Sequence, residues 1–118
     1  MIQGMVNADG SPIVTLKVGG ITWSALVDTG FNGELQLPQV LFQHVHARDE
    51  GLGTSVLANG ETVTEEAYRI DFAFDGENVS AQATFEDADF ILLDTGLLRG
   101  YHLEINFPAR TVRLERVA

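Results

Sequence analysis

Four turn-forming residue pairs divide this chain into short segments and constrain its fold more than any other feature. They are Asp9-Gly10, Gly19-Gly20, Asn59-Gly60 and Asp75-Gly76. Asp-Gly and Asn-Gly favour the left-handed backbone of tight hairpins, and the segments between the pairs alternate apolar and polar residues with the two-residue period of a β-strand. The sequence therefore predicts an all-β domain, with strands at about residues 1–7, 12–18, 21–27, 34–37, 54–58, 61–74, 79–85, 90–93, 101–107 and 111–117.

The length of the chain limits the number of domains. At 118 residues and 12.9 kDa it has the size of one ordinary domain, and a hydrophobic share of 45% is enough to form a buried core. We therefore expect a single domain over residues 1–118. Helix is expected only as one or two turns within residues 39–46 and as one short C-terminal helix that begins at Leu97. Gly51 and Gly53 are expected to mark a loop.

The charge and the amino-acid usage exclude several function classes. Asp and Glu number 17 against 7 Lys and Arg, for a net charge of -10, and such a surface repels phosphate backbones, so we expect no nucleic-acid partner. The chain has no cysteine, which excludes disulfides, thiolate nucleophiles and cysteine-ligated metals. No secretory signal and no apolar run of membrane-spanning length is visible, so a cytoplasmic protein without a membrane partner is expected.

Metal and cofactor motifs are weak in this sequence. His44 and His46 are two positions apart, which would put them on different sides of a helix. Glu86, Asp87 and Asp89 lack a full calcium-loop pattern. We therefore expect no metal and no cofactor.

The motif with the strongest chemical content is Asp28-Thr29-Gly30, which directly follows the apolar segment 21–27. A carboxylate at the end of an interior strand can converge with other polar groups on a cleft. The threonine hydroxyl can bond neighbouring backbone, and the glycine permits a sharp turn. The triplet is therefore the candidate catalytic motif.

The sequence around this triplet resembles the retropepsin-like (clan AA) aspartic proteases, in particular the small bacterial proteins that have Phe after Asp-Thr-Gly. The first match is the stretch from Ala25 to Leu35, which looks like their active-site strand and loop. The second match is the apolar segment 91–93 followed by 97–100 (Leu-Leu-Arg-Gly), and the terminal segments 101–107 and 112–114 also fit. The resemblance spans about residues 12–116 and implies a single-domain acid-protease barrel that acts as a homodimer.

The resemblance also implies roles for individual residues. Asp28 of each subunit would share one proton with its copy across a water molecule, because two like charges so close cannot both ionise. Thr29 would brace the catalytic loops between the subunits, and Gly30 would allow their close approach. The hairpin around Asn59 and Gly60 would be a flap that closes over a peptide, with an exposed hairpin of no function as the alternative.

One residue departs from the family pattern. Asp94 stands where the family has glycine, so Asp94-Thr95-Gly96 forms a second Asp-Thr-Gly triplet. The chain is too short for two lobes that each supply a catalytic triplet, which excludes a pepsin-like reading. Asp94 either places an extra carboxylate beside Asp28, raising the proton affinity of one of them, or points away and makes turn hydrogen bonds before the helix at Leu97.

The sequence therefore leads to two main functional hypotheses. The first is an aspartic endopeptidase in which Asp28 from two subunits activates water to attack a peptide carbonyl. The second is a catalytically inactive dimer of the same fold that binds a peptide or protein partner, because Asp94 disturbs the site. A purely structural monomer is a third class, since one Asp28 alone cannot form the carboxylate pair.

Overall fold

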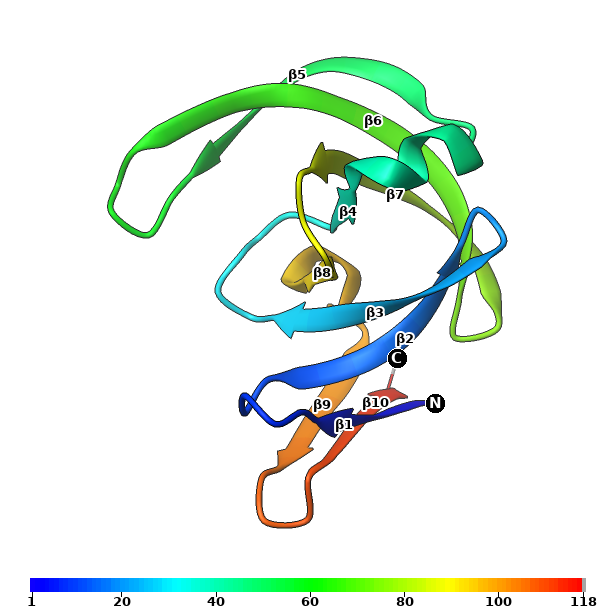
Figure 1. Ribbon diagram of the computed structural model, residues 1–118, viewed down its shortest axis with the longest axis vertical. Helices are drawn as coiled ribbons and strands as arrows, with labels where there is room; N and C mark the ends of the chain where they lie inside the picture. The colour runs from blue at the N-terminus through cyan, green and yellow to red at the C-terminus, as the bar shows by residue number, and fades with distance from the viewer. Residues whose placement is uncertain (118) are drawn as a thin grey trace.

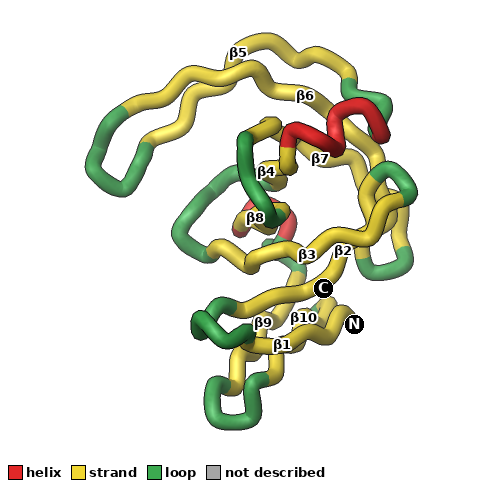
Figure 2. Tube along the Cα trace, in the orientation of Figure 1, coloured by secondary structure: helices red, strands yellow, loops and turns green. Residues whose placement is uncertain are grey.

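The computed structural model describes residues 1–117, and these form ten strands and two short 3-10 helices. Figure 1 shows their arrangement and Figure 2 their distribution along the chain. All ten strands belong to one sheet, in the order β5-β6-β7-β4-β8-β3-β2-β1-β10-β9. The elements are β1 (Ile2–Val6), β2 (Pro12–Val18), β3 (Ile21–Asp28), β4 (Leu35–Pro38), η1 (Gln39–His44), β5 (Arg48–Val56), β6 (Thr62–Phe74), β7 (Glu77–Glu86), β8 (Ile91–Asp94), η2 (Thr95–Leu97), β9 (Tyr101–Asn106) and β10 (Thr111–Arg116).

The prediction of an all-β fold is confirmed, and most of the strands lie where the alternation placed them. Period-2 alternation is visible in β2, where Val14, Leu16 and Val18 are buried and the residues between them are exposed. The same pattern buries Val112 and Leu114 in β10. Alternation works here because successive side chains of a strand point to opposite faces of the sheet.

Three sequence expectations about local structure had different outcomes. The helical turns expected within residues 39–46 form the 3-10 helix η1. The prediction of a loop at Gly51 and Gly53 is wrong, because strand β5 runs through both glycines. The pairing of β5 with β6 shifts register between Asp49 and Leu52. Gly51 has a φ of 85°, so it supplies the left-handed backbone that such a bulge needs.

The short C-terminal helix expected from Leu97 onward is not seen in residues 1–117. A three-residue 3-10 helix, η2, ends at Leu97 instead, and β9 begins at Tyr101. Two tight turns connect η2 to β9. The Leu98 N–H donates to the Thr95 carbonyl at 3.0 Å, and the Tyr101 N–H donates to the Leu98 carbonyl at 2.9 Å. None of the helices in the described part of the chain is long and apolar enough to cross a membrane.

The centre of the sheet consists of β3, β8 and β4, and their pairing positions the functional site. Strand β8 pairs in parallel with β3 and antiparallel with β4, and β4 pairs in parallel with β7. Parallel pairing needs long crossover connections, so residues far apart in sequence end side by side. The core around these strands is apolar and includes Ala25, Val27, Leu35, Leu37, Ile70, Phe74, Ile91 and Leu93, each at most 5% exposed.

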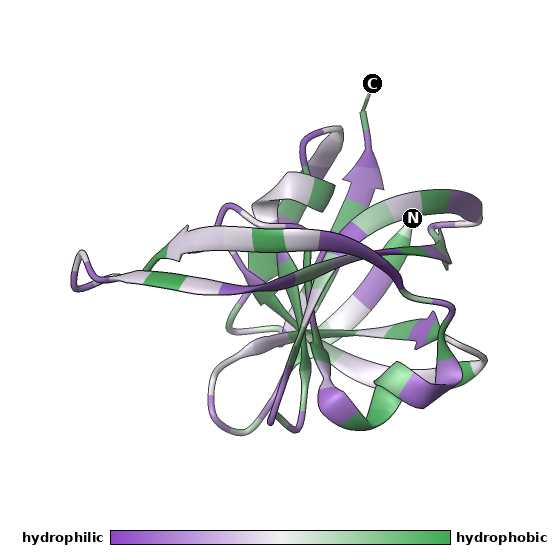
Figure 3. Ribbon diagram, turned by 90° about the horizontal axis from the view of Figure 1, so that it is seen from above, coloured by the Kyte–Doolittle hydropathy of each residue, from purple (hydrophilic) through white to green (hydrophobic). Residues whose placement is uncertain are grey.

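A long hairpin, β5–β6, projects from this body. Figures 1 and 3 show it extending away from the core toward its turn at residues 57–61. The Leu57 N–H donates to the Glu61 carbonyl at 2.8 Å, and the Gly60 N–H donates to the Leu57 carbonyl at 2.9 Å. The projecting hairpin predicted around Asn59 and Gly60 is thus confirmed as a structural element.

The central strands should dominate the stability of the fold. We predict that Leu93→Ala, in β8 and fully buried, lowers the free energy of unfolding by about 2 to 5 kcal/mol, because it leaves a cavity in the core. The matched change Leu52→Ala, in β5 and 73% exposed, should change it by less than about 0.5 kcal/mol. Urea denaturation of the two variants checks this, and equal losses would contradict it.

Candidate functional site

Asp28 is the last residue of β3, and its side chain is half-buried. Its Oδ1 accepts a hydrogen bond from the Gly30 N–H at 3.0 Å, so the carboxylate and the glycine form a tight turn. Thr29 and Gly30 are both exposed. The three residues of the predicted catalytic motif therefore lie together at the end of a central strand, on the surface of the subunit.

Asp94 is brought next to Asp28 by the sheet. Strands β3 and β8 pair in parallel with Asp28 opposite Asp94, so both Asp-Thr-Gly triplets begin at the same level of the sheet. Asp94 differs in its surroundings, because it is fully buried. Its Oδ2 accepts a hydrogen bond from Gln36 Nε2 at 3.3 Å, whereas its Oδ1 is buried without a hydrogen-bond partner in the described chain.

These contacts decide between the two expectations for Asp94. The expectation that its side chain bonds the turn before a helix is wrong, because Asp94 precedes η2 without any side-chain capping bond. Its carboxyl group faces Gln36 of β4 instead. The pKa of Asp94 is raised to about 7, mainly by burial; the Gln36 hydrogen bond acts against this rise, and the charge of Asp28 adds to it as the smallest of the three effects. The raised pKa of Asp94 therefore comes mainly from burial, whereas the neighbouring carboxylate considered from the sequence is the smallest cause.

The second triplet also holds the loop that follows the first. The Thr95 hydroxyl and the Thr95 N–H both donate to the Phe31 carbonyl, at 3.0 and 3.1 Å. The Gly96 N–H donates to the Gly33 carbonyl at 2.8 Å. Residues 95 and 96 therefore hold residues 31–33 in place through these hydrogen bonds. The sequence indicated only that the triplet is repeated, and not that it supports this loop.

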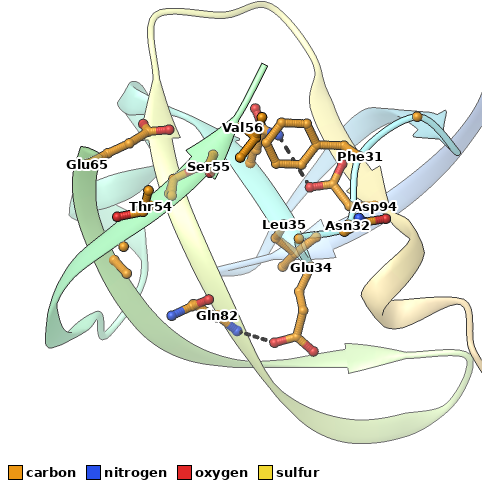
Figure 4. A pocket seen from close by; sticks show the side chains of 16 residues that line it. Phe31, Asn32, Glu34, Leu35, Thr54, Ser55, Val56, Glu65, Gln82 and Asp94 are labelled. Atoms are coloured by element: carbon orange, nitrogen blue, oxygen red, sulfur yellow. Dashed lines mark hydrogen bonds between the residues drawn. The ribbon is translucent and has the colours of Figure 1, made fainter. Parts of the chain in front are cut away.

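A cleft of about 420 Å³ opens between this loop and the β5–β6 hairpin. Figure 4 shows side chains from both sides reaching toward it, with Asp94 and Glu65 at opposite sides of the view. The Gln82 N–H donates to Glu34 Oε1 at 2.8 Å and fixes one wall. The lining residues are Gly30, Phe31, Asn32, Gly33, Glu34, Leu35, Gln36, Gly53, Thr54, Ser55, Val56, Glu65, Ala67, Gln82, Thr84 and Asp94.

The predicted site residues meet this cleft to different extents. Gly30 and Asp94 line it, Asp28 lies at its edge through the Gly30 turn, and Asn59 and Gly60 lie at the tip of the hairpin beyond the lining residues. The sequence did not single out Gln36 or Glu65, because no local motif contains them, and Glu34 was included only as part of the family-like stretch from Ala25 to Leu35. Among residues 1–117, no group of three or more His, Cys, Asp or Glu side chains is placed to hold a metal ion.

Comparisons with known proteins identify the fold. No protein-family model matches the sequence, and no curated protein is significantly similar to it. Among solved structures, a retropepsin-like aspartic protease from Rickettsia conorii has a TM-score of 0.62 at 16% identity and covers 95% of this chain and 86% of its own. EIAV protease complexed with the inhibitor HBY-793 has a TM-score of 0.62 at 16% identity, over 79% of this chain and 89% of its own.

A third similar structure is the foamy viral protease-reverse transcriptase in complex with an RNA/DNA hybrid. Its TM-score is 0.61 at 18% identity, over 80% of this chain, and this chain spans only 13% of the length of that protein. Together these likenesses show that the chain has the retropepsin-like fold. At such low sequence identity, these likenesses are evidence for the fold and for no other property of this chain.

The burial of Asp94 makes a prediction about stability and pH. The folded protein holds the Asp94 proton up to about pH 7, whereas the unfolded chain releases it near its ordinary value of 3.8. The contribution of this group to the free energy of unfolding is therefore fully present below about pH 4. It is lost as the pH rises to about 7, and the loss is on the order of 4 kcal/mol. Asp94→Asn cannot titrate, so its stability relative to wild type should rise over that range and then level off.

Urea denaturation between pH 4 and 8 measures this difference. The matched control is Asp9→Asn, in the exposed turn between β1 and β2, which should run parallel to wild type. A constant difference between Asp94→Asn and wild type across the range would show that Asp94 is ionised in the folded protein.

The close approach of Gly96 to the loop makes a second prediction. A Cβ at Gly96 would lie 2.5 Å from the Gly33 carbonyl oxygen and 2.9 Å from Glu34 Cγ. Gly96→Ala should therefore destabilise the fold by about 1 to 3 kcal/mol through displacement of the loop. Gly100→Ala is the matched control, because a Cβ there meets nothing within 4 Å. Thermal unfolding compares them, and an equal melting temperature would refute the packing role of Gly96.

Proposed function

Starting from the retropepsin-like fold, we propose that this protein is an aspartic endopeptidase that works as a homodimer. The observation that supports this most directly is the position of Asp28-Thr29-Gly30. The triplet ends a central strand, is exposed at residues 29 and 30, and adjoins a cleft covered by a projecting hairpin. In the proposal, Asp28 acts at the edge of this cleft, to which Gly30 of the same turn contributes.

The proposed chemistry needs two copies of Asp28, one from each subunit. One carboxylate, as general base, takes a proton from a water molecule while the water oxygen attacks the peptide carbonyl carbon. The other, as carboxylic acid, donates its proton to the carbonyl oxygen. The resulting diol intermediate breaks its C–N bond as the leaving nitrogen takes the proton now held by the first carboxyl group. A diol hydroxyl returns a proton to the other carboxylate, and an acid and an amine are released. The two carboxyl groups titrate as a pair.

Exposure of the triplet supports pairing between subunits. Thr29 and Gly30 lie on the surface of the single chain, where a second copy can cover them. In the proposal, Thr29 braces the two loops against each other and Gly30 permits their approach. Each subunit contains a single Asp28, so the carboxyl pair forms only in the dimer.

The β5–β6 hairpin is the proposed flap. It carries Leu52, Val56 and Leu57 with 73, 66 and 39% of their surface exposed, and such apolar side chains gain by closing over a bound peptide. Strand β5 is an edge of the sheet, so its free backbone groups can pair with an extended peptide. Asn59 and Gly60 form the turn at the end of this flap.

A second candidate function is supported by Asp94. Its buried carboxyl group lies opposite Asp28 in the paired strands. Above about pH 7, where Asp94 ionises, its negative charge opposes ionisation of the Asp28 pair. The alternative is therefore an inactive homodimer of the same fold that binds a peptide or protein partner in the cleft.

The proposed activity is tested with a mixed peptide library incubated at acidic to neutral pH. We predict cleavage by the wild type, inhibition by a statine-type transition-state mimic, and a loss of roughly 10²- to 10⁴-fold in kcat/KM for Asp28→Asn, because the acid and base are removed. Mass spectrometry of the products measures this. Glu104→Gln, an exposed acid on β9 at the far edge of the sheet, serves as the charge-matched control.

Two outcomes would reject the endopeptidase. The first is no cleavage at any pH with peptide binding retained, which supports the binding function. The second is a wild-type protein that sediments as a monomer at micromolar concentration, together with an Asp28→Asn variant that cleaves peptides as fast as the wild type. This result would rule out the carboxyl pair.

A further inference from the structure

A row of polar side chains crosses four neighbouring strands and begins at the proposed catalytic carboxylate. Strands β3, β8, β4 and β7 follow one another in the sheet. Asp28 lies opposite Asp94, and Gln36 lies opposite Thr84. Gln36 also lies opposite Leu92, two residues before Asp94. Because paired residues and residues two apart in a strand share a face of the sheet, one face carries all four polar side chains, which we call the polar row.

The other face of the same strands is apolar. Leu93 precedes Asp94 in β8, Leu35 precedes Gln36 in β4, and Ala83 precedes Thr84 in β7. These three apolar residues belong to the core and are each at most 2% exposed. Asp94, Gln36 and Thr84, in contrast, line the cleft. The central strands therefore turn an apolar face to the core and a polar face to the cleft.

Two atoms of the polar row are buried without a hydrogen-bond partner in the described chain. They are Asp94 Oδ1 and Thr84 Oγ1. The other oxygen of the fully buried Asp94, Oδ2, accepts a hydrogen bond from Gln36 Nε2 at 3.3 Å (Figure 4). Buried polar groups in folded proteins are nearly always hydrogen-bonded, and one that stays unpaired costs stability. A polar group of a molecule bound in the cleft would supply the partner that Asp94 Oδ1 lacks.

The rest of the cleft limits the charge of such a group. Its other polar lining residues include the uncharged Asn32, Thr54, Ser55 and Gln82. Its ionisable lining residues are all acidic, namely Glu34, Glu65 and Asp94, and no Lys, Arg or His of residues 1–117 lines it. Like charges that face each other across a binding site cost free energy. The cleft therefore disfavours an acidic side chain and leaves uncharged polar and basic side chains as candidates.

The burial of Asp94 favours the uncharged candidates. Burial keeps its carboxyl group protonated up to about pH 7. A basic side chain could form an ion pair with Asp94 only after this buried group had ionised, and a buried ion pair carries a large desolvation cost. A carboxamide has one oxygen acceptor, two N–H donors and no charge. It can therefore bond to Asp94 Oδ1 whether that oxygen donates or accepts.

From this arrangement we propose that the cleft recognises a carboxamide side chain of the bound peptide, asparagine or glutamine, and that Asp94 and Gln36 select it. The carboxamide would hydrogen-bond to Asp94 Oδ1, while Gln36 fixes the carboxyl group through Oδ2. Since Asp28 begins the same polar row, the selected residue would lie close to the peptide bond that is cut. This inference rests on the proposed peptide-binding cleft and names the class of peptide that it selects.

The test uses peptides that are identical except at one position, which is moved along the sequence. One set carries Asn, Leu or Asp at this position, and a second set carries Gln, Met, Glu or Lys. Binding to the Asp28→Asn protein is measured by fluorescence anisotropy at mildly acidic pH, so that it does not depend on catalysis, and cleavage by the wild type is measured in parallel.

At one position we expect a carboxamide to be preferred. Asn should bind about tenfold more tightly than Leu, and Gln about tenfold more tightly than Met, because an apolar side chain leaves the buried Asp94 oxygen unpaired. Asp, Glu and Lys should each bind more weakly than the carboxamide of the same set.

Variants then assign the preference to the polar row. Asp94→Leu keeps a similar shape without polar atoms, so the Leu peptide should bind to it at least as tightly as the Asn peptide. Gln36→Met should lower the Asn-to-Leu ratio about threefold, because Asp94 loses the bond that orients it. Gln82→Met makes the same chemical change at an exposed residue of the same cleft, and this matched control should leave the ratio unchanged. Thermal unfolding verifies that each variant is folded.

The outcomes separate this inference from the proposed activity. Cleavage without any preference for a carboxamide, or with Lys preferred to Gln, overturns the inference and leaves the endopeptidase intact. The same holds for a preference that survives in both Asp94→Leu and Gln36→Met. Selective binding of Asn or Gln peptides without cleavage supports the inference and overturns the endopeptidase. Failure to bind any peptide overturns both.

Discussion

The pairing of β3 with β8 is the contact on which the rest of the structure depends. It sets Asp28 opposite Asp94, and β4 then pairs with the other side of β8 through Leu35 and Gln36. The hydrogen bonds from Thr95 and Gly96 to the loop after Asp28 follow from that register. A shift of one residue would turn the apolar side chains of β8 away from the core, so core packing and site geometry enforce the same register.

Burial gives the two aspartates different properties although their sequence motifs are the same. Asp28 is half-buried beside an exposed threonine and glycine, whereas Asp94 is enclosed and holds its proton to about pH 7. Retaining a buried carboxyl group lowers stability as the pH rises. Such a cost is typical of residues at functional sites, where local chemistry is kept at the expense of packing.

The acidic character of the protein also differs between its surfaces. On parts of the surface remote from the cleft, acids such as Asp71 and Asp75 have basic or N-terminal partners. Along the cleft, Glu65 lies close to another carboxyl group and lacks a basic partner within the described chain. Part of the acidic character of the chain therefore lies along the cleft, on Glu34, Glu65 and Asp94, and the overall composition gave no indication of this distribution.

The sequence alone determined the fold class, most of the strand positions, the projecting hairpin and the retropepsin-like resemblance, because alternation, turn pairs and the Asp-Thr-Gly motif are local signals. It did not determine the bulge at Gly51, the turns that lead from Leu97 into β9 in place of the expected helix, or the environment of Asp94. Those features depend on which strands become neighbours. The pairing of β8 between β3 and β4 joins residues distant in sequence, so only the tertiary structure decided it.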